Sequence, residues 1–480
     1  MTPINKLVAF TLLLLWYAPL EIAHANDNEL LSQAKLNELL KEYKLSGVSV
    51  AVIDDFNVVY SATAGEKVFG SGDSINQSTA FSTASISKPV TALLAAMLEE
   101  QGKLSLDDSV AKYLTRWTLQ KEQFPNPEEI TFRRLLSHTA GTTQSGFADF
   151  YKGDVVPTAI DSLNGVSVPR YDSPISLAFK PGESWSYSGG GYVIVQIALE
   201  DLTGKTLPEL AEEMLFKPLN MVNTTMYQPD SPLFLQNVAS VHHDDLSVIQ
   251  SGYPICPQIA PSGMWSNALD MATLIIEMQR ALNGDDTKVI SQAVARNTTQ
   301  IETLDVVGGW GLGWMRLEAK GNLEWFSHGG SNTGTGGQIM GTMRDGRGIA
   351  IFGNGGNPAR IPVIETVIAT VVEKLDWKKS LPVVKQQVPL ELLNDFEGKY
   401  LAGFGETIEI SKQNNQLFYQ GRLLLWSHIE SGELVYLGDG EFGVEGYPNR
   451  LSLETVSGKK RLKVSRKGSD KVSYFESAPE

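Results

Sequence analysis

The sequence predicts a mixed α/β fold of the α+β type, in which an antiparallel sheet flanked by helices is assembled from both ends of a large domain. Strand patterns lie near the start of that domain and again within residues 323–352, with mostly helical and loop sequence between them. We expect this middle part to form a helical lobe. From residue 390 the pattern changes to short alternating segments, which predict a small antiparallel β-domain of barrel-like form.

Length and composition agree with two folded units. The chain has 480 residues, of which 42% are hydrophobic and 20% charged, as is typical of globular proteins. Its net charge of −15 would repel phosphate backbones and anionic lipid surfaces. We therefore expect no nucleic-acid partner and no binding to membrane surfaces.

Residues 1–25 predict a signal peptide. Lys6 precedes an apolar run from Leu7 to Ala18, and Ala23-His24-Ala25 has the small-x-small form of a cleavage site. The alternative, a membrane anchor, is disfavoured because a spanning helix needs ~20 apolar residues. We expect cleavage after Ala25 and a periplasmic or secreted protein.

The elements of the large domain, residues 26–377, follow from hydrophobic spacing and turn residues. Leucines between residues 28 and 44 recur at helical spacing, and Gly47 is expected to end that helix. A strand pair is then predicted around a turn at Asp54-Asp55. The expected strands are Val48 to Ile53, Val58 to Ser61, Leu323 to Ser327, Gln338 to Met343 and Gly348 to Phe352, and a helix from Ile361 to Leu375 follows them.

Residues 378–389 predict an exposed linker, because lysines and prolines occur there without periodicity. The C-terminal β-domain is then expected over residues 390–480. Its aromatic residues Trp426, Tyr436 and Phe442 are interpreted as core rather than as a binding surface. The single cysteine, Cys256, cannot form an intramolecular disulfide and is interpreted as a small buried hydrophobic residue.

Ser85 and Lys88 stand three residues apart at the head of a predicted helix, with Pro89 in its first turn. Residues at this spacing share one helical face. A hydroxyl becomes a good nucleophile when a neighbour accepts its proton, and a lysine in a partly dry site can be neutral enough to do so. Alone, the pair would indicate only a solvated helix start.

Two further motifs give the pair a context. Tyr187-Ser188-Gly189 lies on a glycine-rich loop before a predicted helix from Tyr192 to Leu202, which Gly204 closes. His328-Gly329-Gly330 is expected at the end of a strand, where glycine would let a substrate backbone lie alongside. Taken singly, Tyr187 would be an aromatic cap and His328 a hydrogen-bonded loop histidine.

In order and spacing, these motifs resemble the serine β-lactamase and penicillin-binding-protein family, in the branch of class C β-lactamases, DD-peptidases, esterases and D-aminopeptidases. The S-x-x-K element of the family is Ser85 to Lys88. Its Tyr-x-Asn element is met in part by Tyr187-Ser188-Gly189, and its His-x-Gly element by His328-Gly329-Gly330. The resemblance spans about residues 30–377 and includes the stretches 135–141, 218–221, 262–266 and 310–314.

The resemblance implies acyl transfer through a covalent intermediate, with Ser85 as nucleophile and Lys88 and Tyr187 handling the proton as a coupled pair. Backbone N–H groups of Ser85 and Ser331 would hold the oxyanion, and His328 and Gly330 would line the substrate site. His138, in the stretch 135–141, is interpreted as structural support for the loop between the lobes. No metal or organic cofactor is implied.

Two departures from the family pattern bear on the substrate. Gly189 stands where the family has Asn, and Gly329 where a Thr would offer a hydroxyl to a substrate carboxylate. Both favour a small ester or an unusual amide over efficient penicillin hydrolysis. The run His242-His243-Asp244-Asp245 is interpreted as a solvated turn, because adjacent loop residues rarely converge on one metal ion.

We therefore expect an exported serine hydrolase that acts on a small-molecule ester, amide or D-amino-acid peptide, as an esterase or aminopeptidase does. One alternative is a DD-peptidase or class C-type β-lactamase acting on peptidoglycan peptides or penicillins. The other is an inactive scaffold whose C-terminal domain binds a partner, which the intact Ser85, Lys88 and Tyr187 disfavour. Nothing in the sequence predicts an oligomeric state.

Overall fold

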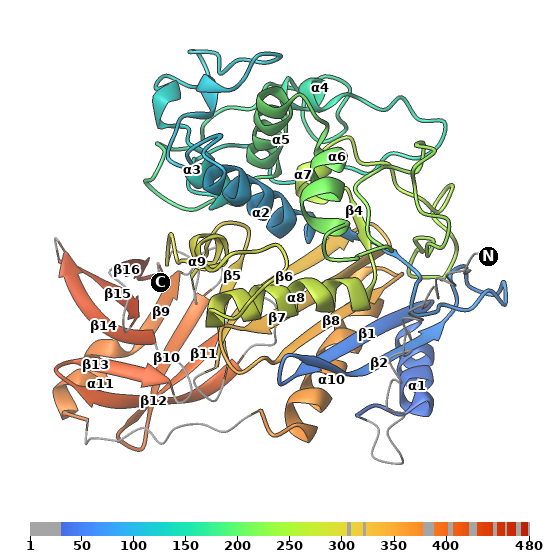
Figure 1. Ribbon diagram of the computed structural model, residues 1–480. Helices are drawn as coiled ribbons and strands as arrows, with labels where there is room; N and C mark the ends of the chain where they lie inside the picture. The colour runs from blue at the N-terminus through green and yellow to red at the C-terminus, as the bar shows by residue number, and fades with distance from the viewer. Residues whose placement is uncertain are drawn as a thin grey trace, which may run out of the picture.

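The structure is a computed structural model with two lobes and a separate C-terminal β-domain (Figure 1). It describes residues 30–304, 309–319, 323–377, 388–401, 407–421, 430–444, 449–456, 458–466 and 472–478. The predicted signal peptide, residues 1–25, lies outside the described residues, as does all of the predicted linker except residues 388 and 389. Within the described ranges no helix is both long and apolar enough to cross a bilayer.

The main sheet has six strands in the order β2-β1-β8-β7-β6-β5. All its neighbouring strands are antiparallel, and β1 pairs directly with β8. The sheet therefore joins the two ends of the large domain, which confirms the predicted architecture. The strands are β1 Gly47–Asp54, β2 Asn57–Gly65, β5 Met315–Ala319, β6 Leu323–Asn332, β7 Thr335–Thr342 and β8 Gly348–Gly353.

Side chains of β1 alternate between two cores, as the two-residue period of a strand requires. Val48, Val50 and Val52 belong to the core beneath α1 and α10. Ala51 and Ile53 belong to the larger core on the other face, which α8 covers by packing on β1, β7 and β8 (Figure 1). The covering helices are α1 Gln33–Tyr43, α8 Ala268–Asn283 and α10 Asn357–Lys374.

Some predicted boundaries near the N-terminus were wrong. Helix α1 ends at Tyr43, and Lys44 follows with a left-handed φ of 55° and donates its N–H to Leu40. Gly47 begins β1 instead of ending the helix. The turn between β1 and β2 is Asp55-Phe56, both at positive φ, one residue later than expected, because the hydrogen-bonded register continues to the pair Asp54 and Asn57.

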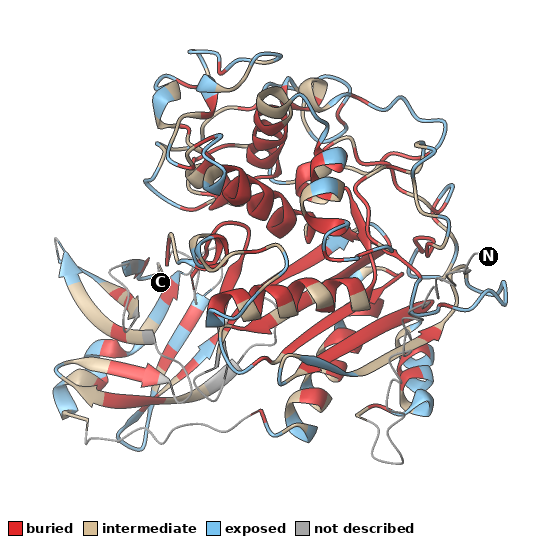
Figure 2. Cartoon of the chain, in the orientation of Figure 1, coloured by how far each residue is buried: buried red, intermediate tan, exposed pale blue. Residues whose placement is uncertain are grey.

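The helical lobe is built around α2 and α5, whose residues are almost all buried (Figure 2). A two-stranded sheet of β3 and β4 lies where this lobe meets the main sheet. The elements of this lobe and the junction are β3 Phe81–Ala84, α2 Ser87–Glu100, η1 Val110–Lys112, η2 Pro127–Glu129, α3 Phe132–Leu136, α4 Ala159–Leu163, α5 Gly189–Thr203, α6 Leu207–Ala211, η3 Glu212–Phe216, α7 Ile259–Ser262, β4 Met264–Ser266 and α9 Gln292–Thr299.

Several other predicted element boundaries in the large domain differ from the structure, and those of α5, α10 and β6 bear on the site. Helix α5 already begins at Gly189, so the glycines belong to its first turn and not to a loop before it. Gly204 closes it in a left-handed conformation, as predicted. Helix α10 begins at Asn357, because a proline is tolerated in its first turn. Strand β6 continues to Asn332, so His328 lies within the strand and not at its end.

The C-terminal domain is an antiparallel sheet of eight strands in sequential order, with α11 packed on it. A bridge between Tyr400 and Ser477, with a 2.8 Å hydrogen bond from the Ala478 N–H to the Lys399 carbonyl, brings its two ends together. The elements are α11 Leu390–Phe396, β9 Gly398–Leu401, β10 Thr407–Gln413, β11 Gln416–Gly421, β12 Glu430–Gly438, β13 Glu441–Val444, β14 Asn449–Val456, β15 Lys459–Arg466 and β16 Val472–Glu476.

The core of this domain agrees with the aromatic residues chosen from the sequence. Tyr436 and Phe442 are buried in it, and the rings of Phe396 and Phe442 have centroids 4.5 Å apart. Helix α11 was not predicted, because its seven residues are too short to show a clear helical period. Trp426 lies outside the described residues.

Gly330 tests how tightly β6 is joined to the helical lobe. A Cβ at this residue would lie 2.0 Å from the backbone oxygen of Thr83 in β3, which cannot move aside like a flexible side chain. We expect Gly330→Ala to destabilise the large domain by ~1–3 kcal/mol or more, as overpacking does. Calorimetric unfolding would measure it. Gly146→Ala is the control, because its Cβ meets only ordinary contact at 3.6 Å, and equal melting temperatures for the two variants would contradict the prediction.

Candidate active site

Ser85 lies on a sharp turn between β3 and α2. The residue before it, Ala84, has a left-handed φ of 51°, which is uncommon for a residue other than glycine and is often found at functional sites. Ser87 fixes the turn, because its hydroxyl donates to the Ala84 carbonyl at 2.6 Å and accepts the Met264 N–H at 2.9 Å. The turn therefore holds Ser85 at the head of the helix with its side chain on a cavity wall.

Lys88 lies in the first turn of α2 and is only 1% exposed. Its Nζ is 3.2 Å from the Ser85 hydroxyl oxygen and donates to the Pro261 carbonyl at 3.0 Å. Both partners are neutral, and burial holds the pKa of Lys88 well below its usual range. A neutral amine at this place can accept the proton of the Ser85 hydroxyl.

Tyr187 covers this amine. The ring centroid of Tyr187 is 4.6 Å from Lys88 Nζ, and its phenol is hydrogen-bonded to Ser85. Burial raises the pKa of Tyr187 above its usual value, although the bond with Ser85 opposes this. The phenol is therefore neutral at physiological pH, so it can pass a proton on but is a poor base.

The start of α5 fixes the position of Tyr187. The next residue, Ser188, caps the helix by accepting the Gly191 N–H, and its hydroxyl donates to the Thr143 carbonyl at 2.7 Å. The Ser188 N–H donates to Nδ1 of His138 at 3.1 Å. Because both the side chain and the backbone N–H of Ser188 are hydrogen-bonded, the adjacent Tyr187 has little freedom to turn away from Ser85.

His138 is more closely linked to the site than the sequence indicated. It is buried, its ring centroid lies 4.3 Å from that of Tyr187, and it supports the residue that follows Tyr187, in agreement with the structural role expected of it. Its pKa is well below the usual value because of burial and the nearby Lys88 and His328. His138 is therefore neutral, and it supports Tyr187 by packing and by its hydrogen bond with Ser188.

His328, Gly330 and Ser331 were predicted to line the substrate site, but of these three only Ser331 lies on the wall of the cavity at Ser85. His328 is 1% exposed, and burial together with Lys88 lowers its pKa to about 3. Its ring lies behind Tyr187 and Trp310, with centroids 6.4 and 5.6 Å away. Gly330 lies against β3, and Ser331 lines the cavity beside Ser85 and donates its hydroxyl to Asn357 at 2.7 Å.

The cavity that contains Ser85, Lys88, Tyr187 and Ser331 has a volume of about 560 Å³. It lies where the helical lobe meets the end of β6 and the start of α10, and polar groups predominate on its walls. The other lining residues are Ser145, Gly146, Phe147, Asp149, Arg170, Gly189, His242, His243, Asp244, Ile249, Pro261, Ser262, Asn332, Thr333, Gly334, Gly356, Asn357 and Pro358.

The loop at residues 145–150 fills the place where the family has an asparagine. A Cβ at Gly189 would lie 3.1 Å from the Ser145 carbonyl oxygen and 3.3 Å from the Phe147 ring. A larger residue at this position would have to displace that loop. The glycine is therefore matched by its surroundings, and Phe147 supplies an apolar wall where an amide would otherwise stand.

The prediction for His242 was wrong. It is fully buried, accepts the Phe69 N–H at Nε2 and lies 3.1 Å from the Asn354 carbonyl at Nδ1. Only the following residues, 243–245, are exposed. Burial lowers the pKa of His242, so it is a neutral structural residue in the cavity wall. In the described part of the chain, no group of three histidine, cysteine, aspartate or glutamate side chains could hold a metal ion.

Asp149 and Arg170 are cavity residues that the sequence did not single out. Each lies in a loop without periodicity, and the backbone partner of Asp149, Thr333, is 184 residues away. Cys256 is buried, as predicted, but its thiol is 3.7 Å from a carboxylate oxygen of Asp149. No local signal could have placed these side chains together.

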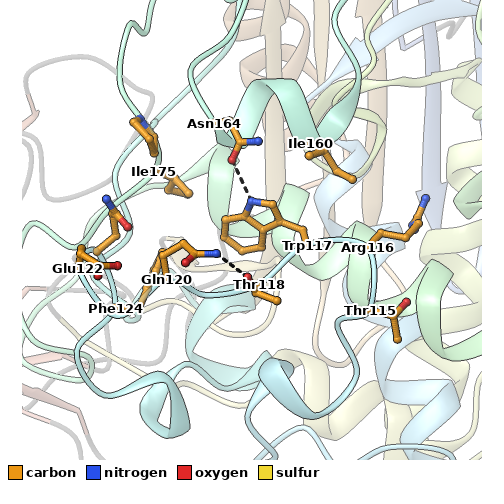
Figure 3. Close-up of a pocket in the computed structure, with 12 residues that line it drawn as sticks. Thr115, Arg116, Trp117, Thr118, Gln120, Glu122, Phe124, Ile160, Asn164 and Ile175 are labelled. Carbon is orange, nitrogen blue, oxygen red and sulfur yellow. Dashed lines mark hydrogen bonds between the residues drawn. The ribbon is translucent and has the colours of Figure 1, made fainter.

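A second cavity, of about 540 Å³, lies in the helical lobe around Trp117 (Figure 3). The indole N–H of Trp117 donates to Asn164 at 3.0 Å, and Gln120 donates to Thr118. The described residues that line it include no serine, cysteine, lysine or histidine. It therefore lacks the serine and lysine pair of the first cavity, and the cavity at Ser85 is the candidate active site.

The large domain matches a known protein family. Residues 33–372 match the family model described as Beta-lactamase. Penicillin-binding protein 4 of Amycolatopsis lactamdurans is 26% identical over 337 residues, which cover 68% of this chain and 84% of that protein. Esterase EstB of Burkholderia gladioli is 23% identical over 310 residues, 59% of this chain and 78% of the esterase.

Solved structures share the fold over most of the chain. The octameric penicillin-binding protein homologue from Pyrococcus abyssi has a TM-score of 0.58 and 21% identity, and the match covers 92% of this chain and 98% of that one. SurE with D-Leu has a TM-score of 0.56 and 20% identity, over 93% and 98% of the two chains. Both matches extend beyond the large domain.

Lys88 should determine the acid side of the pH profile. If its neutral amine is the base, kcat/KM falls as the pH drops through the lowered pKa of Lys88, because the protonated amine cannot accept a proton. His328, with a pKa of about 3, stays neutral above pH 5 and does not contribute. Lys88→Arg, which stays charged, should lose ~10²–10⁴-fold in kcat.

Steady-state kinetics between pH 5 and 9 with a p-nitrophenyl ester would measure both effects. Lys67→Arg is the control, because Lys67 forms a salt bridge with Asp73 outside the cavity. Full activity of Lys88→Arg would exclude the lysine as the base.

Proposed function

The chain belongs to the β-lactamase family of serine hydrolases, and we propose that it cleaves a small ester or amide through an acyl-enzyme on Ser85. The observation that carries this proposal is the contact between the Lys88 amine, which burial favours in its neutral form, and the Ser85 hydroxyl. Its Nζ is within hydrogen-bond distance of the Ser85 hydroxyl in a buried setting that lowers its pKa. A nucleophile and a base in contact on a cavity wall are the minimum for this chemistry.

In the first half-reaction, the Ser85 oxygen attacks the substrate carbonyl while its proton passes to Lys88. Backbone N–H groups of Ser85 and Ser331 would stabilise the oxyanion; contact of Gly330 with β3 and the shared cavity of the two residues support this assignment. The Tyr187 phenol gives its proton to the leaving alcohol or amine and recovers one from Lys88. The acyl group remains on Ser85.

In the second half-reaction, a water molecule attacks the acyl carbonyl. Its proton passes to the Tyr187 and Lys88 pair, and a proton returns to the Ser85 oxygen as the acid leaves. The protein ends each turnover in its starting protonation state. The pair acts as one relay, since the two groups contact each other and both contact Ser85.

The wall around Gly189 favours an esterase-like or aminopeptidase-like activity. An asparagine side chain there would bind a substrate amide, whereas the Phe147 ring offers only apolar contact. The second candidate is a DD-peptidase or β-lactamase acting on peptidoglycan peptides or penicillins. The similarity to penicillin-binding protein 4 over 84% of that protein supports this candidate.

We also propose that the protein is exported and loses residues 1–25, on the basis of Lys6, the apolar run after it and Ala23-His24-Ala25. Expression of the full sequence in a Gram-negative host, followed by fractionation, should give mature protein in the periplasm that begins at Asn26. N-terminal sequencing would check the cleavage site. Full-length protein retained in the cytoplasm would contradict the proposal.

Covalent labelling tests the nucleophile. A fluorophosphonate should add one group to the wild type on the peptide that contains Ser85, and intact mass would detect it. Ser85→Ala should remain unlabelled and lose at least ~10³-fold in ester hydrolysis, with an unchanged melting profile. Ser145→Ala, which removes another cavity serine, should still be labelled. Labelling of Ser85→Ala would remove Ser85 from the proposed role.

The same mass measurement with benzylpenicillin separates the two candidate functions. An adduct on Ser85, or hydrolysed drug, would favour the penicillin-directed activity. Unmodified protein beside intact drug, with ester hydrolysis retained, would favour the esterase-like or aminopeptidase-like activity.

A further inference from the structure

Asp149 is a carboxylate on the cavity wall that the proposed chemistry does not use. Its Oδ2 accepts the Thr333 N–H at 3.2 Å, and its Oδ1 accepts from the Cys256 thiol at 3.7 Å. The side chain is partly exposed, and it lines the same cavity as Ser85. Both donors are neutral, so neither supplies a positive charge to the carboxylate.

The corner that holds Asp149 is rigid. The next residue, Phe150, forms two backbone hydrogen bonds with Ile255, at 3.2 and 2.7 Å. The Cys256 N–H donates to Gln228, whose amide also donates to the Gly263 carbonyl at 2.8 Å. A carboxylate in such a fixed setting can bind a ligand group without losing much side-chain freedom.

The donors that contact Asp149 are neutral, so a cation of the substrate could pair with its carboxylate. Burial raises its pKa, and the hydrogen bonds from Thr333 and Cys256 oppose this, as does the charge of the exposed Arg170 on the cavity wall. A protonated amine placed against the carboxylate would supply the missing positive charge at close range.

The position along the chain sets the length of the substrate. Thr333, which binds Asp149, is two residues after Ser331, the proposed oxyanion residue. Two residues of chain span at most ~7 Å. With the hydrogen bond from Thr333 to Asp149 added, an amino group bound at Asp149 would lie no more than a short peptide's length from the carbonyl under attack.

We propose that Asp149 binds the protonated amino group of the substrate, so that esters and amides of free amino acids or short peptides with a free N-terminus are preferred over N-acylated ones. This inference rests on the proposed function for the identity of the reacting carbonyl. The amine site itself is a binding property and can be measured without turnover.

The competing interpretation is structural. Asp149 links the loop at residues 145–150 to the turn between β6 and β7, and its loss could simply loosen that wall. A loosened wall would weaken binding of all ligands, whereas loss of an amine site would weaken binding of free-amine ligands alone. The two interpretations therefore predict different results with paired ligands.

The experiment is calorimetric titration of the full chain with Ser85→Ala, which prevents turnover. The ligands are D-alanine p-nitroanilide and its N-acetyl derivative at pH 6.5, where an α-amino group with an ordinary pKa of ~7.7–8.0 is protonated. The free-amine compound should bind more tightly. Adding Asp149→Asn should weaken its binding by about 10- to 100-fold and leave the N-acetyl compound within about 2-fold.

Asp154→Asn is the matched control. It removes the same charge in the neighbouring segment, where Asp154 accepts the Tyr151 N–H and does not line the cavity. It should keep the preference for the free amine. Equal loss of both ligands in Asp149→Asn, absence of any preference, or absence of binding would each overturn the inference. If the preference is present but Ser85 is not labelled by the fluorophosphonate, the proposed function fails and the amine site stands.

Discussion

The site depends on the burial of one amine with neutral partners. Lys88 lies at the start of a helix that is buried on nearly every side, and its Nζ contacts only a hydroxyl, a carbonyl and aromatic faces in the described structure. A carboxylate partner would keep this amine charged and useless as a base. The groups around Lys88 must also be uncharged, and His138 and His328 are neutral because burial lowers the pKa of each ring.

The geometry of the site comes from the junction between the lobes. Close backbone contact of Gly330 with Thr83, and a hydrogen bond from the Thr335 hydroxyl to the Ser82 carbonyl, join the central sheet to the strand that leads into Ser85. The sheet supplies Ser331, and the helical lobe supplies Tyr187. Neither lobe alone holds the full set of groups, so the rigidity of the junction determines how well they are aligned.

Local patterns in the sequence predicted much of this arrangement. The spacing of Ser85 and Lys88, and the apolar runs of β1 and β8, depend on neighbours within one element, and the structure agrees with the predicted helix start and strands. Position in space was harder to infer. His242 looked like part of a solvated run, yet it is buried by contacts with Phe69 and Asn354 from distant segments. Asp149 gave no signal, because only the folded chain brings it to Thr333. The turn between β1 and β2 was placed one residue too early, since a bulky residue such as Phe56 at positive φ is rarely expected.

The pairing of β1 with β8 has a consequence for how the protein is made. Val48 is opposite Gly353, so the sheet cannot be completed until about 300 further residues have left the ribosome. Contacts between such distant segments form slowly, because a long loop must close before they stabilise the chain. Until then the hairpin of β1 and β2 has an unpaired edge and an apolar face, which are hazards for aggregation during synthesis. Chaperones that bind the new chain and keep it extended would therefore protect a protein of this topology from aggregation until β8 has been made.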